Sequence, residues 1–218
     1  MADHEDPLLP DAAVEALGGT PGTVARRPAS PVRLVLPPAL AARVGSFDRA
    51  GEALFDRIRG RPAADRLFFG ASALGDFSLL WHLVGAGRAL ATGDERSWAR
   101  LAVALGAESL VVNVGIKSLF RRTRPAWEQG RPHELRRPRS SSFPSGHATS
   151  GFMAATLLAE RRPASAPAWY ALAAVVGASR VHVKIHHASD VAAGAVIGVA
   201  FGRLVRRLRP LGPIGPRR

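Results

Sequence analysis

The sequence predicts an all-α membrane protein, a bundle of about five membrane helices preceded by an amphipathic helix. Hydrophobic residues make up 47% of the 218-residue chain and gather in long blocks. Arginines lie mostly between these blocks, as they do in the loops of membrane proteins. The sequence contains no cysteine, which excludes a disulfide scaffold, a thiolate zinc site and a cysteine nucleophile.

The N-terminal part of the chain precedes the apolar blocks. Residues 1–40 are rich in Ala, Pro and Gly, and their acidic start lacks the apolar core of a secretory signal peptide, so we expect a disordered tail. Residues 41–66 carry apolar side chains at helical spacing with charges between them, which predicts an amphipathic helix. Such a helix lies on a membrane surface or packs on the rest of the protein, and the pattern favours neither.

The apolar blocks define a membrane domain over residues 67–205, with a basic tail over 206–218. A helix needs about 20 mostly apolar residues to cross a bilayer. The first, second and fifth blocks approach this length, whereas the third and fourth are shorter and span only if their polar flanks face protein. The five blocks are residues 67–91, 99–120, 147–158, 166–178 and 188–205.

Polar and small residues inside these blocks indicate a packed bundle. Asp76, His82 and Glu108 are ionisable, and such residues in membrane helices usually face the interior. They either line a functional cavity or make structural contacts between helices, and we favour structural contacts. Glycines 194, 198 and 202 recur at a four-residue spacing, which allows helix backbones to approach closely.

The charge of the chain indicates an anionic ligand for its second half. The formal net charge is +13, and it divides into −1 over residues 1–108 and +14 over residues 109–218. A basic chain first suggests nucleic acid. However, aromatic residues make up only 6% of the chain and no tract alternates arginine with aromatic residues, so we expect no nucleic-acid partner. Arginine also binds phosphate well, because its guanidinium group is planar and always charged.

Three polar stretches of the second half carry the residues suited to phosphate chemistry. They are KSLFRRTRP at residues 117–125, SSFPSGHATS at residues 141–150 and SRVHVKIHHASD at residues 179–190. Each borders one or two of the apolar blocks. If the blocks alternate across a membrane, all three stretches emerge on the same side and form one basic mouth.

The second stretch opens a helix with Ser145 and Gly146. Free backbone N–H groups at a helix start bind anions, and glycine lets a ligand approach the backbone closely. The Ser145 hydroxyl suits either a phosphate oxygen or the cap of its own helix. Ordinary helix starts have similar sequences, so this stretch alone is a weak signal.

The third stretch supplies a histidine with a carboxylate at helical spacing. His186 and Asp190 are four residues apart and share a face on a helical turn. A carboxylate on one imidazole nitrogen leaves the other nitrogen free to attack. His187 competes for this role from spacing alone, and His147 provides a second imidazole that could act as general acid.

Three cations complete the set of candidate residues. Lys117, Arg124 and Arg180 could stabilise the negative charge that develops on phosphate oxygens during transfer. Taken singly, each is also typical of a charge that extends from a membrane edge into water. Their value as a signal depends on their occurrence together with the histidines.

Together the three stretches resemble the type 2 phosphatidic acid phosphatase superfamily, which includes lipid phosphate phosphatases and vanadium haloperoxidases. Members show Lys, six residues and Arg-Pro, then Pro-Ser-Gly-His, then Ser-Arg, five residues, His, three residues and Asp. This chain matches all three elements in order and spacing, at residues 117–125, 144–147 and 179–190. Two departures are a count of five spans, where many bacterial members have six, and the charge of Lys184 inside the third element.

The resemblance implies an integral membrane enzyme that hydrolyses a lipid phosphate without a metal or other cofactor. His186 would attack phosphorus and form a phosphohistidine, Asp190 would orient it, and His147 would act as general acid and base. The implied phosphate-binding residues are Lys117, Arg124, Ser145, Gly146 and Arg180. The substrate would be a phosphomonoester or diphosphate of a prenyl lipid or glycerolipid, with most similarity to small bacterial polyprenyl-phosphate phosphatases of the cell membrane.

Two other interpretations remain open from the sequence. One is a soluble acid phosphatase or haloperoxidase of the same superfamily, against which the long apolar blocks argue. The other is a membrane protein that binds anionic lipids without catalysis. The complete set of His147, His186 and Asp190 favours the enzyme over a pure lipid-binding protein. The basic face with the motifs favours a cytoplasmic site, whereas the C-terminal arginines favour the opposite orientation.

Overall fold

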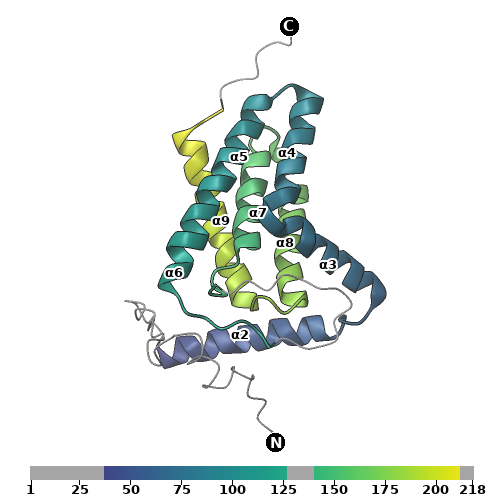
Figure 1. The fold of residues 1–218 in the computed structure, drawn as a ribbon, viewed down its shortest axis with the longest axis vertical. Coiled ribbons are helices and arrows are strands. Elements are labelled where there is room, and N and C mark those ends of the chain that lie inside the picture. Colours follow the sequence, from purple (N-terminus) through teal and green to yellow (C-terminus); the bar gives the residue numbers. More distant parts are fainter. Residues whose placement is uncertain (1–36, 127–139, 212–218) are drawn as a thin grey trace, which may run out of the picture. The chain divides into compact units, whose positions relative to one another are not determined.

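The computed structural model describes residues 37–126 and 140–211, which belong to one compact unit, Pro31–Arg218. Every regular element in these ranges is a helix, so the predicted all-α fold is confirmed. Helices α5, α7, α8 and α9 run side by side, and α2 lies across one end of them (Figure 1). The helices are α2 (Pro38–Asp56), α3 (Pro62–Gly75), α4 (Leu79–Thr92), α5 (Glu95–Leu110), α6 (Lys117–Leu119), α7 (Gly146–Leu158), α8 (Ala166–His182) and α9 (Ala188–Leu208).

Helix α7 forms the centre of the bundle. Ten of its 13 residues are buried, and it packs mainly against α9 and α8. The glycines of α9 make this contact close, because a Cβ added to Gly194 would lie 2.6 Å from the carbonyl oxygen of Ser145. A Cβ added to Gly202 would lie equally close to the Cβ of Thr156. The close helix approach predicted from the glycine spacing is therefore confirmed, and it fixes the start of α7 against α9.

The first apolar block is interrupted, which the sequence analysis did not predict. Residues 67–91 were expected to form one helix, but a 3₁₀ turn at Asp76–Ser78 separates α3 from α4. Phe77 and Ser78 have φ angles of 52° and 58°, in the left-handed region that such side chains rarely adopt. The break brings the Asp76 carboxylate to 3.3 Å from Nε2 of His147, so this costly conformation provides the buried imidazole with a partner.

Three stretches of the described residues are long and apolar enough to cross a membrane: Pro62–Thr92, Glu95–Leu119 and Ala188–Leu208. The third and fourth apolar blocks are also helical, as α7 and α8, but are shorter than these stretches. Helix α7 is enclosed by its neighbours, so its length is not limited by contact with lipid. The count of about five membrane helices remains a prediction, although each of the five blocks is helical.

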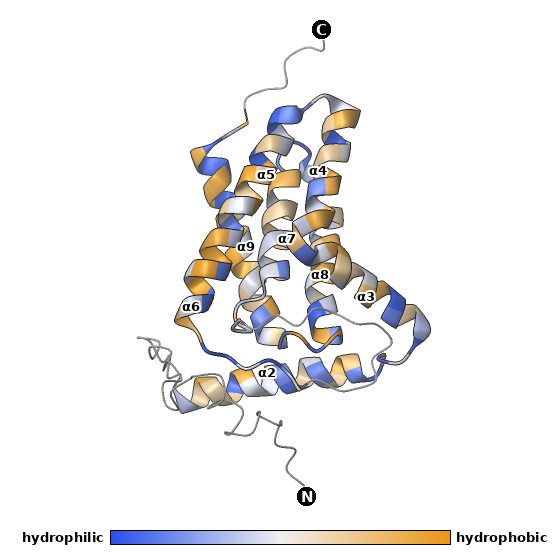
Figure 2. Ribbon diagram, viewed as in Figure 1, coloured by the Kyte–Doolittle hydropathy of each residue, from blue (hydrophilic) through white to orange (hydrophobic). Residues whose placement is uncertain are grey.

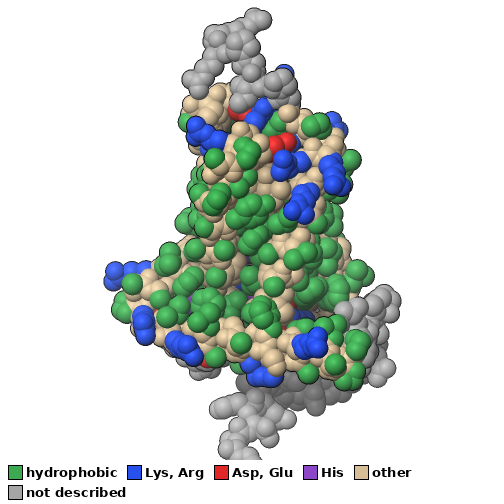
Figure 3. All heavy atoms as spheres, turned by 180° about the vertical axis from the view of Figure 1, so that it is seen from behind, with side chains coloured by type: hydrophobic (Ala, Val, Ile, Leu, Met, Phe, Trp, Pro, Cys, Tyr) green, Lys and Arg blue, Asp and Glu red, His purple; other side chains and the backbone are tan. Residues whose placement is uncertain are grey.

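The outer surface is apolar along the helices. Large hydrophobic side chains on α4, α5 and α9 are exposed, for example Leu90 at 89% and Val196 at 71%. Figure 2 shows apolar residues along α5 and α9, and Figure 3 shows lysine and arginine gathered at the two ends of the helices. This pattern is that of a multi-pass membrane protein and argues against the soluble alternative.

The segment predicted as one helix over residues 41–66 is divided. Helix α2 begins earlier, at Pro38, and ends at Asp56, and α3 begins at Pro62 after a turn in which Gly60 has a φ of 79°. Proline suits the first turn of a helix, because its missing N–H would have no partner there. The tail predicted over residues 1–40 lies outside the described residues except for 37–40. Helix α9 continues to Leu208 in the predicted basic tail, of which 212–218 are not described.

Helix α2 packs on the rest of the protein, one of the two alternatives that its amphipathic pattern left open, and it also exposes apolar side chains. One face packs against α8 and α9, and Arg59 just beyond the helix donates to the carbonyl oxygens of Val181 and His182 at 2.8 and 2.7 Å. The other face carries exposed apolar side chains at a seven-residue spacing, Leu40, Phe47 and Leu54. The helix is therefore anchored to the protein, and its placement on a membrane surface remains a prediction.

Candidate active site

The three polar stretches converge at the end of the bundle where α5 and α6 end and α7 begins. They surround a cavity of about 500 Å³. Five of the eight predicted site residues line this cavity directly, namely Lys117, Gly146, His147, Arg180 and His186. The other three contact its lining: Arg124 and Asp190 approach His186, and Ser145 begins the helix that carries His147. The structure thus brings the predicted residues together on one side of the helices.

His186 and Asp190 form the dyad that their spacing suggested. His186 lies in the turn between α8 and α9 and is 3% exposed, and its Nδ1 is 3.5 Å from Oδ2 of Asp190. The same carboxylate oxygen accepts a hydrogen bond from the backbone N–H of His187 at 2.9 Å, which fixes Asp190 in the first turn of α9. Because the carboxylate faces Nδ1, the proton belongs on Nδ1 and the lone pair on Nε2.

The environment of His186 keeps its imidazole neutral. Burial lowers the pKa of His186 to about 3, Asp190 opposes this shift, and the charges of Arg180 and Arg124 add to it. A histidine with such a pKa carries a free lone pair at neutral pH. Since Nε2 lies 3.4 Å from Nη1 of Arg124, this lone pair lies beside a cation that could hold a phosphate oxygen.

His187, the competing histidine, has a different environment. Its Nε2 lies 3.2 Å from the carbonyl oxygen of Thr123, and the residue precedes α9 as its cap. His187 does not belong to the residues that line the cavity among those described, whereas His186 does. The geometry therefore favours His186 as the nucleophile candidate.

His147 lies in the first turn of α7 and is held by the break between α3 and α4. Its Nε2 is 3.0 Å from the carbonyl oxygen of Ser72 and 3.3 Å from Oδ1 of Asp76. Asp76, which we expected to be a structural contact, is thus the partner of a candidate catalytic residue. With Nε2 occupied, Nδ1 is the nitrogen of His147 that can exchange a proton with a substrate.

Each of the three predicted cations is fixed by a neutral acceptor. Arg124 donates from Nη1 to the carbonyl oxygen of Ile185 at 2.9 Å, and Lys117 donates to Oδ1 of Asn113 at the same distance. Arg180 donates to the hydroxyl group of Ser72, the residue whose carbonyl oxygen contacts His147. These acceptors direct the three side chains, and those of Lys117 and Arg180 line the cavity.

Ser145 and Gly146 form the start of α7. The Ser145 hydroxyl accepts a hydrogen bond from the backbone N–H of Ala148 at 3.5 Å, so it caps the helix in this structure. Its own N–H donates to the carbonyl oxygen of Asp190 at 3.0 Å. A Cβ on Gly146 would lie 3.7 Å from Nζ of Lys117, which shows that this helix start faces the lysine. The backbone N–H groups and the ammonium together suit an anion.

Sequence reasoning missed a chain of polar contacts behind the dyad. Arg122 donates from Nη1 to Oδ1 of Asp190 at 2.5 Å and to the Ser189 hydroxyl at 2.7 Å, and its Nη2 contacts Oδ2 of Asp48 at 2.5 Å. Asp48, on α2, also accepts from the backbone N–H of Ser189 at 2.8 Å. Asp190 is fully buried, so these contacts balance its charge. The sequence showed that this helix carries charged faces, but the spacing of residues along the chain did not indicate which residue pairs with Asp48.

Lys184, the charge inside the third motif, belongs to the surroundings of α2. Its Nζ lies 3.3 Å from Oε1 of Glu52 and 4.0 Å from Oδ1 of Asp56. We had expected it either to contact phosphate or to face water. The structure shows it paired with these two acids on α2, and its side chain is 12% exposed, so it does not simply face water.

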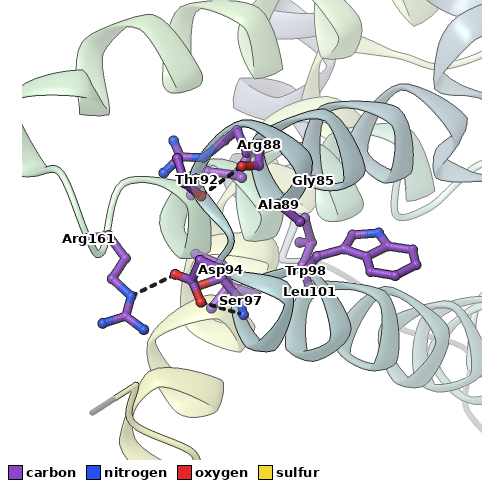
Figure 4. Close-up of a pocket in the computed structure, with 11 residues that line it drawn as sticks. Gly85, Arg88, Ala89, Thr92, Asp94, Ser97, Trp98, Leu101 and Arg161 are labelled. Carbon is purple, nitrogen blue, oxygen red and sulfur yellow. Dashed lines mark hydrogen bonds and ion pairs between the residues drawn. The ribbon is translucent and has the colours of Figure 1, made fainter. Parts of the chain in front are cut away.

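A second pocket lies at the opposite end of α5 and α7 (Figure 4). It offers about 20 Å³, room for little more than one water molecule. Asp94 accepts a hydrogen bond from the backbone N–H of Ser97 and pairs with Arg161, so this region caps α5 and joins it to the end of α7. It is a structural region. Over residues 37–126 and 140–211, no group of three or more His, Cys, Asp or Glu side chains is placed to hold a metal ion.

Comparisons with known proteins place the chain in a family. The sequence model of the PAP2 superfamily matches residues 97–211, which include all three polar stretches. Decaprenylphosphoryl-5-phosphoribose phosphatase of Mycolicibacterium smegmatis is 38% identical over 149 residues, which are 63% of this chain and 74% of that protein. Lipid A 1-phosphatase of Porphyromonas gingivalis is 35% identical over 120 residues, 51% of this chain, but the match spans only 24% of that protein.

Two solved structures share the fold. The transmembrane PAP2 type phosphatidylglycerolphosphate phosphatase from Bacillus subtilis aligns with 79% of this chain and 87% of its own, with a TM-score of 0.56 and 23% identity. Aquifex aeolicus LpxE aligns with 71% of this chain and 93% of its own, with the same TM-score and 26% identity.

Proposed function

Since the chain belongs to the PAP2 superfamily, we propose that its site hydrolyses a lipid phosphate through a phosphohistidine. The observation that carries this proposal is the buried His186, with Asp190 at its Nδ1 and Arg124 beside its Nε2. An imidazole arranged in this way is a nucleophile that faces a bound anion. The metal-independent chemistry implied by the sequence fits a site in which side-chain cations supply the charge.

The reaction has two steps at one phosphorus atom. In the first, Nε2 of His186 attacks phosphorus in line, the bond to the lipid oxygen breaks, and His147 gives its proton to the leaving alkoxide. In the second, water attacks the phosphohistidine, His147 takes a proton from that water, and the bond to Nε2 breaks to release phosphate. Lys117, Arg124 and Arg180 hold the phosphate oxygens in both steps, as catalysis of phosphoryl transfer by positioning and charge requires.

The substrate combines a phosphate with a membrane-embedded tail. Helix α2 crosses the end of the bundle at which Asp48 contacts Ser189 near the His186 turn, and it exposes Leu40, Phe47 and Leu54 on one face. We infer that this face lies in the membrane interface, so that the phosphate reaches the cations while the tail stays in the bilayer. By their names, the relatives act on a polyprenyl-linked sugar phosphate and on lipid A, and we favour a phosphate-bearing lipid with a polyprenyl tail for this chain.

Phosphate release by the purified full chain in detergent, with EDTA present, tests the proposal. The substrates are polyprenyl phosphate and diphosphate, phosphatidic acid and a phosphoribosyl polyprenyl phosphate. We expect release from at least one lipid by the wild type, and a loss of at least about 10³-fold in His186→Ala, because the nucleophile is absent.

His187→Ala is the matched control, since it removes a neighbouring imidazole that contacts Thr123. We expect it to keep activity within about threefold of the wild type, the scale of a surface change. If folded wild-type protein releases no phosphate from any lipid, or if His186→Ala keeps its activity, the proposal is wrong. Lipid binding without release would then support the anionic-lipid-binding alternative.

A further inference from the structure

The cavity extends beyond the phosphate site towards α4 and α5. Besides the motif residues, its lining includes His82 from α4 and the α5 residues Leu105, Glu108 and Ser109. None of these belongs to the three motifs. At about 500 Å³ the cavity is larger than a phosphate group, so it has room for a further part of a substrate next to the phosphate.

One carboxyl oxygen of Glu108, in this extension, is buried without a hydrogen-bond partner among the described residues. The residue is 2% exposed, and its Oε1 makes no hydrogen bond to any part of the described chain. Buried polar atoms in folded proteins are nearly always paired, and an ionisable residue within a membrane helix marks a functional site more often than not. An unpaired carboxyl oxygen at a cavity wall is therefore an acceptor available to a ligand.

The wall of Glu108 is joined to the phosphate site by a ladder of polar contacts. Lys117 donates to Oδ1 of Asn113, and Nδ2 of Asn113 donates to the Ser109 hydroxyl at 3.1 Å. A π-helical turn at Val111–Ile116 lies within this ladder. Such turns are frequent at functional sites, because the extra residue redirects the side chains that follow. A ligand phosphate at Lys117 thus has polar groups on the same wall, towards Glu108.

We propose that Glu108 and His82 form a subsite for hydroxyl groups, so that the preferred substrate carries its phosphate on a sugar or another polyol. A hydroxyl group both donates and accepts a hydrogen bond, so it pairs with Glu108 whether the carboxyl group is ionised or neutral. A plain alkyl chain would leave Oε1 unpaired and in contact with methylene groups. This inference rests on the proposed phosphatase function and narrows its substrate class.

Two soluble phosphomonoesters test the subsite. Ribose 5-phosphate carries hydroxyl groups beside the phosphate, whereas butyl phosphate has none. The dissociation constant of each for the purified full chain in detergent is measured from its shift of thermal unfolding, and kcat/KM from phosphate release. For the wild type we expect ribose 5-phosphate to bind at least tenfold more tightly, since a site built for hydroxyl groups rejects an analogue without them.

Variants of the subsite give the decisive comparison. Glu108→Leu should lower the ratio of the two dissociation constants at least tenfold, and His82→Ala, at a half-buried position, provides a second reading if Glu108→Leu fails to fold. Glu95→Leu is the matched control, because Glu95 is exposed in the first turn of the same helix, away from the cavity, and should keep the ratio. An unchanged ratio in both folded subsite variants, or no preference in the wild type, would overturn the subsite.

The outcomes also separate the subsite from the phosphatase function. Hydrolysis of both esters without discrimination would refute the subsite and leave the function supported. Tighter binding of ribose 5-phosphate that depends on Glu108, without hydrolysis of any phosphate ester, would support the subsite and refute the function.

Discussion

Replacement of Arg122 by glutamine should lower kcat without a comparable change in KM. Arg122 does not line the cavity, but its guanidinium group contacts Oδ1 of Asp190 at 2.5 Å and Oδ2 of Asp48 at 2.5 Å. The variant removes a charge-assisted hydrogen bond from a fully buried carboxylate, which costs about 1.5–3 kcal/mol. Asp190 keeps its contact with the His187 N–H, so the carboxylate stays in place but is less firmly oriented towards His186.

If this cost is expressed in the transition state, in which His186 becomes positively charged or phosphorylated, kcat should fall by about 10- to 100-fold. Arg122→Lys should recover part of the loss, because one ammonium group can reach Asp190 or Asp48 but cannot hold both in the geometry of a guanidinium fork. The assay is steady-state phosphate release against lipid concentration, with the melting temperature of each variant recorded.

Arg121→Gln is the control for the general loss of one positive charge, since Arg121 is the exposed neighbour of Arg122. A rise in KM at constant kcat would show that Arg122 binds the substrate phosphate directly. A kcat equal to that of the wild type would show that Asp190 needs no support from α2. Either result would refute the positioning role.

Two further predictions concern stability. Gly194→Val should lower the free energy of unfolding by about 1–3 kcal/mol, because its Cβ would meet the Ser145 carbonyl oxygen at 2.6 Å. Thermal unfolding in detergent measures this loss. An unchanged melting temperature would contradict the prediction and show that α7 can move aside. Asp94→Asn should cost about 1 kcal/mol at pH 7 through the weakened cap of α5. Although burial raises it, hydrogen bonds from Ser97 and the charge of Arg161 leave the pKa of Asp94 below its ordinary value, so this stabilisation is present above that value and is lost as pH falls through the pKa of the folded protein. The difference in melting temperature between wild type and variant should therefore stay nearly constant from pH 7 to about pH 5 and shrink as the pH falls below the ordinary value of 3.8. A difference that is unchanged at about pH 2 would contradict the ionic origin.

The helical class could be predicted from the sequence because it depends on local patterns. The structure also brings the residues of the three motifs together, and their catalytic roles remain a prediction. The apolar blocks appear as helices. His186 lies in the turn before α9 and Asp190 lies in the first turn of that helix, which brings Nδ1 of His186 to 3.5 Å from Oδ2 of Asp190. The internal spacing of each motif thus determined local geometry. The alternation of helices across a membrane then placed the three motifs at one end of the bundle.

The parts that escaped prediction depend on partners far along the chain. The break at Asp76–Ser78 has no glycine or proline within it, and Asp76 gains its role only when α7 brings His147 beside it. In the same way, Asp48 lies 74 residues before Arg122, and its charge was indistinguishable from the other acids of α2 until the fold placed them together. A single sequence carries no signal for such pairs, because neither helical period nor motif spacing links them.

The partners of the cations separate the site from its surroundings on physical grounds. Arg122 and Lys184 lie within the motif stretches, yet each pairs with carboxylates of α2 or α9. The positive charges of these two residues therefore stabilise the packing of the helices. Lys117, Arg124 and Arg180 donate hydrogen bonds to an amide oxygen, to carbonyl groups and to a hydroxyl group, and they supply positive charge at the site. In a cavity with little water, that charge attracts an anion more strongly than it would at the surface. The carboxylates near the cavity have complementary tasks: Asp190 and Asp76 each hold one nitrogen of an imidazole, so the other nitrogen of His186 and of His147 is available to the substrate. Glu108 alone has an oxygen without a partner among the described residues, which is why substrate discrimination is expected to depend on it.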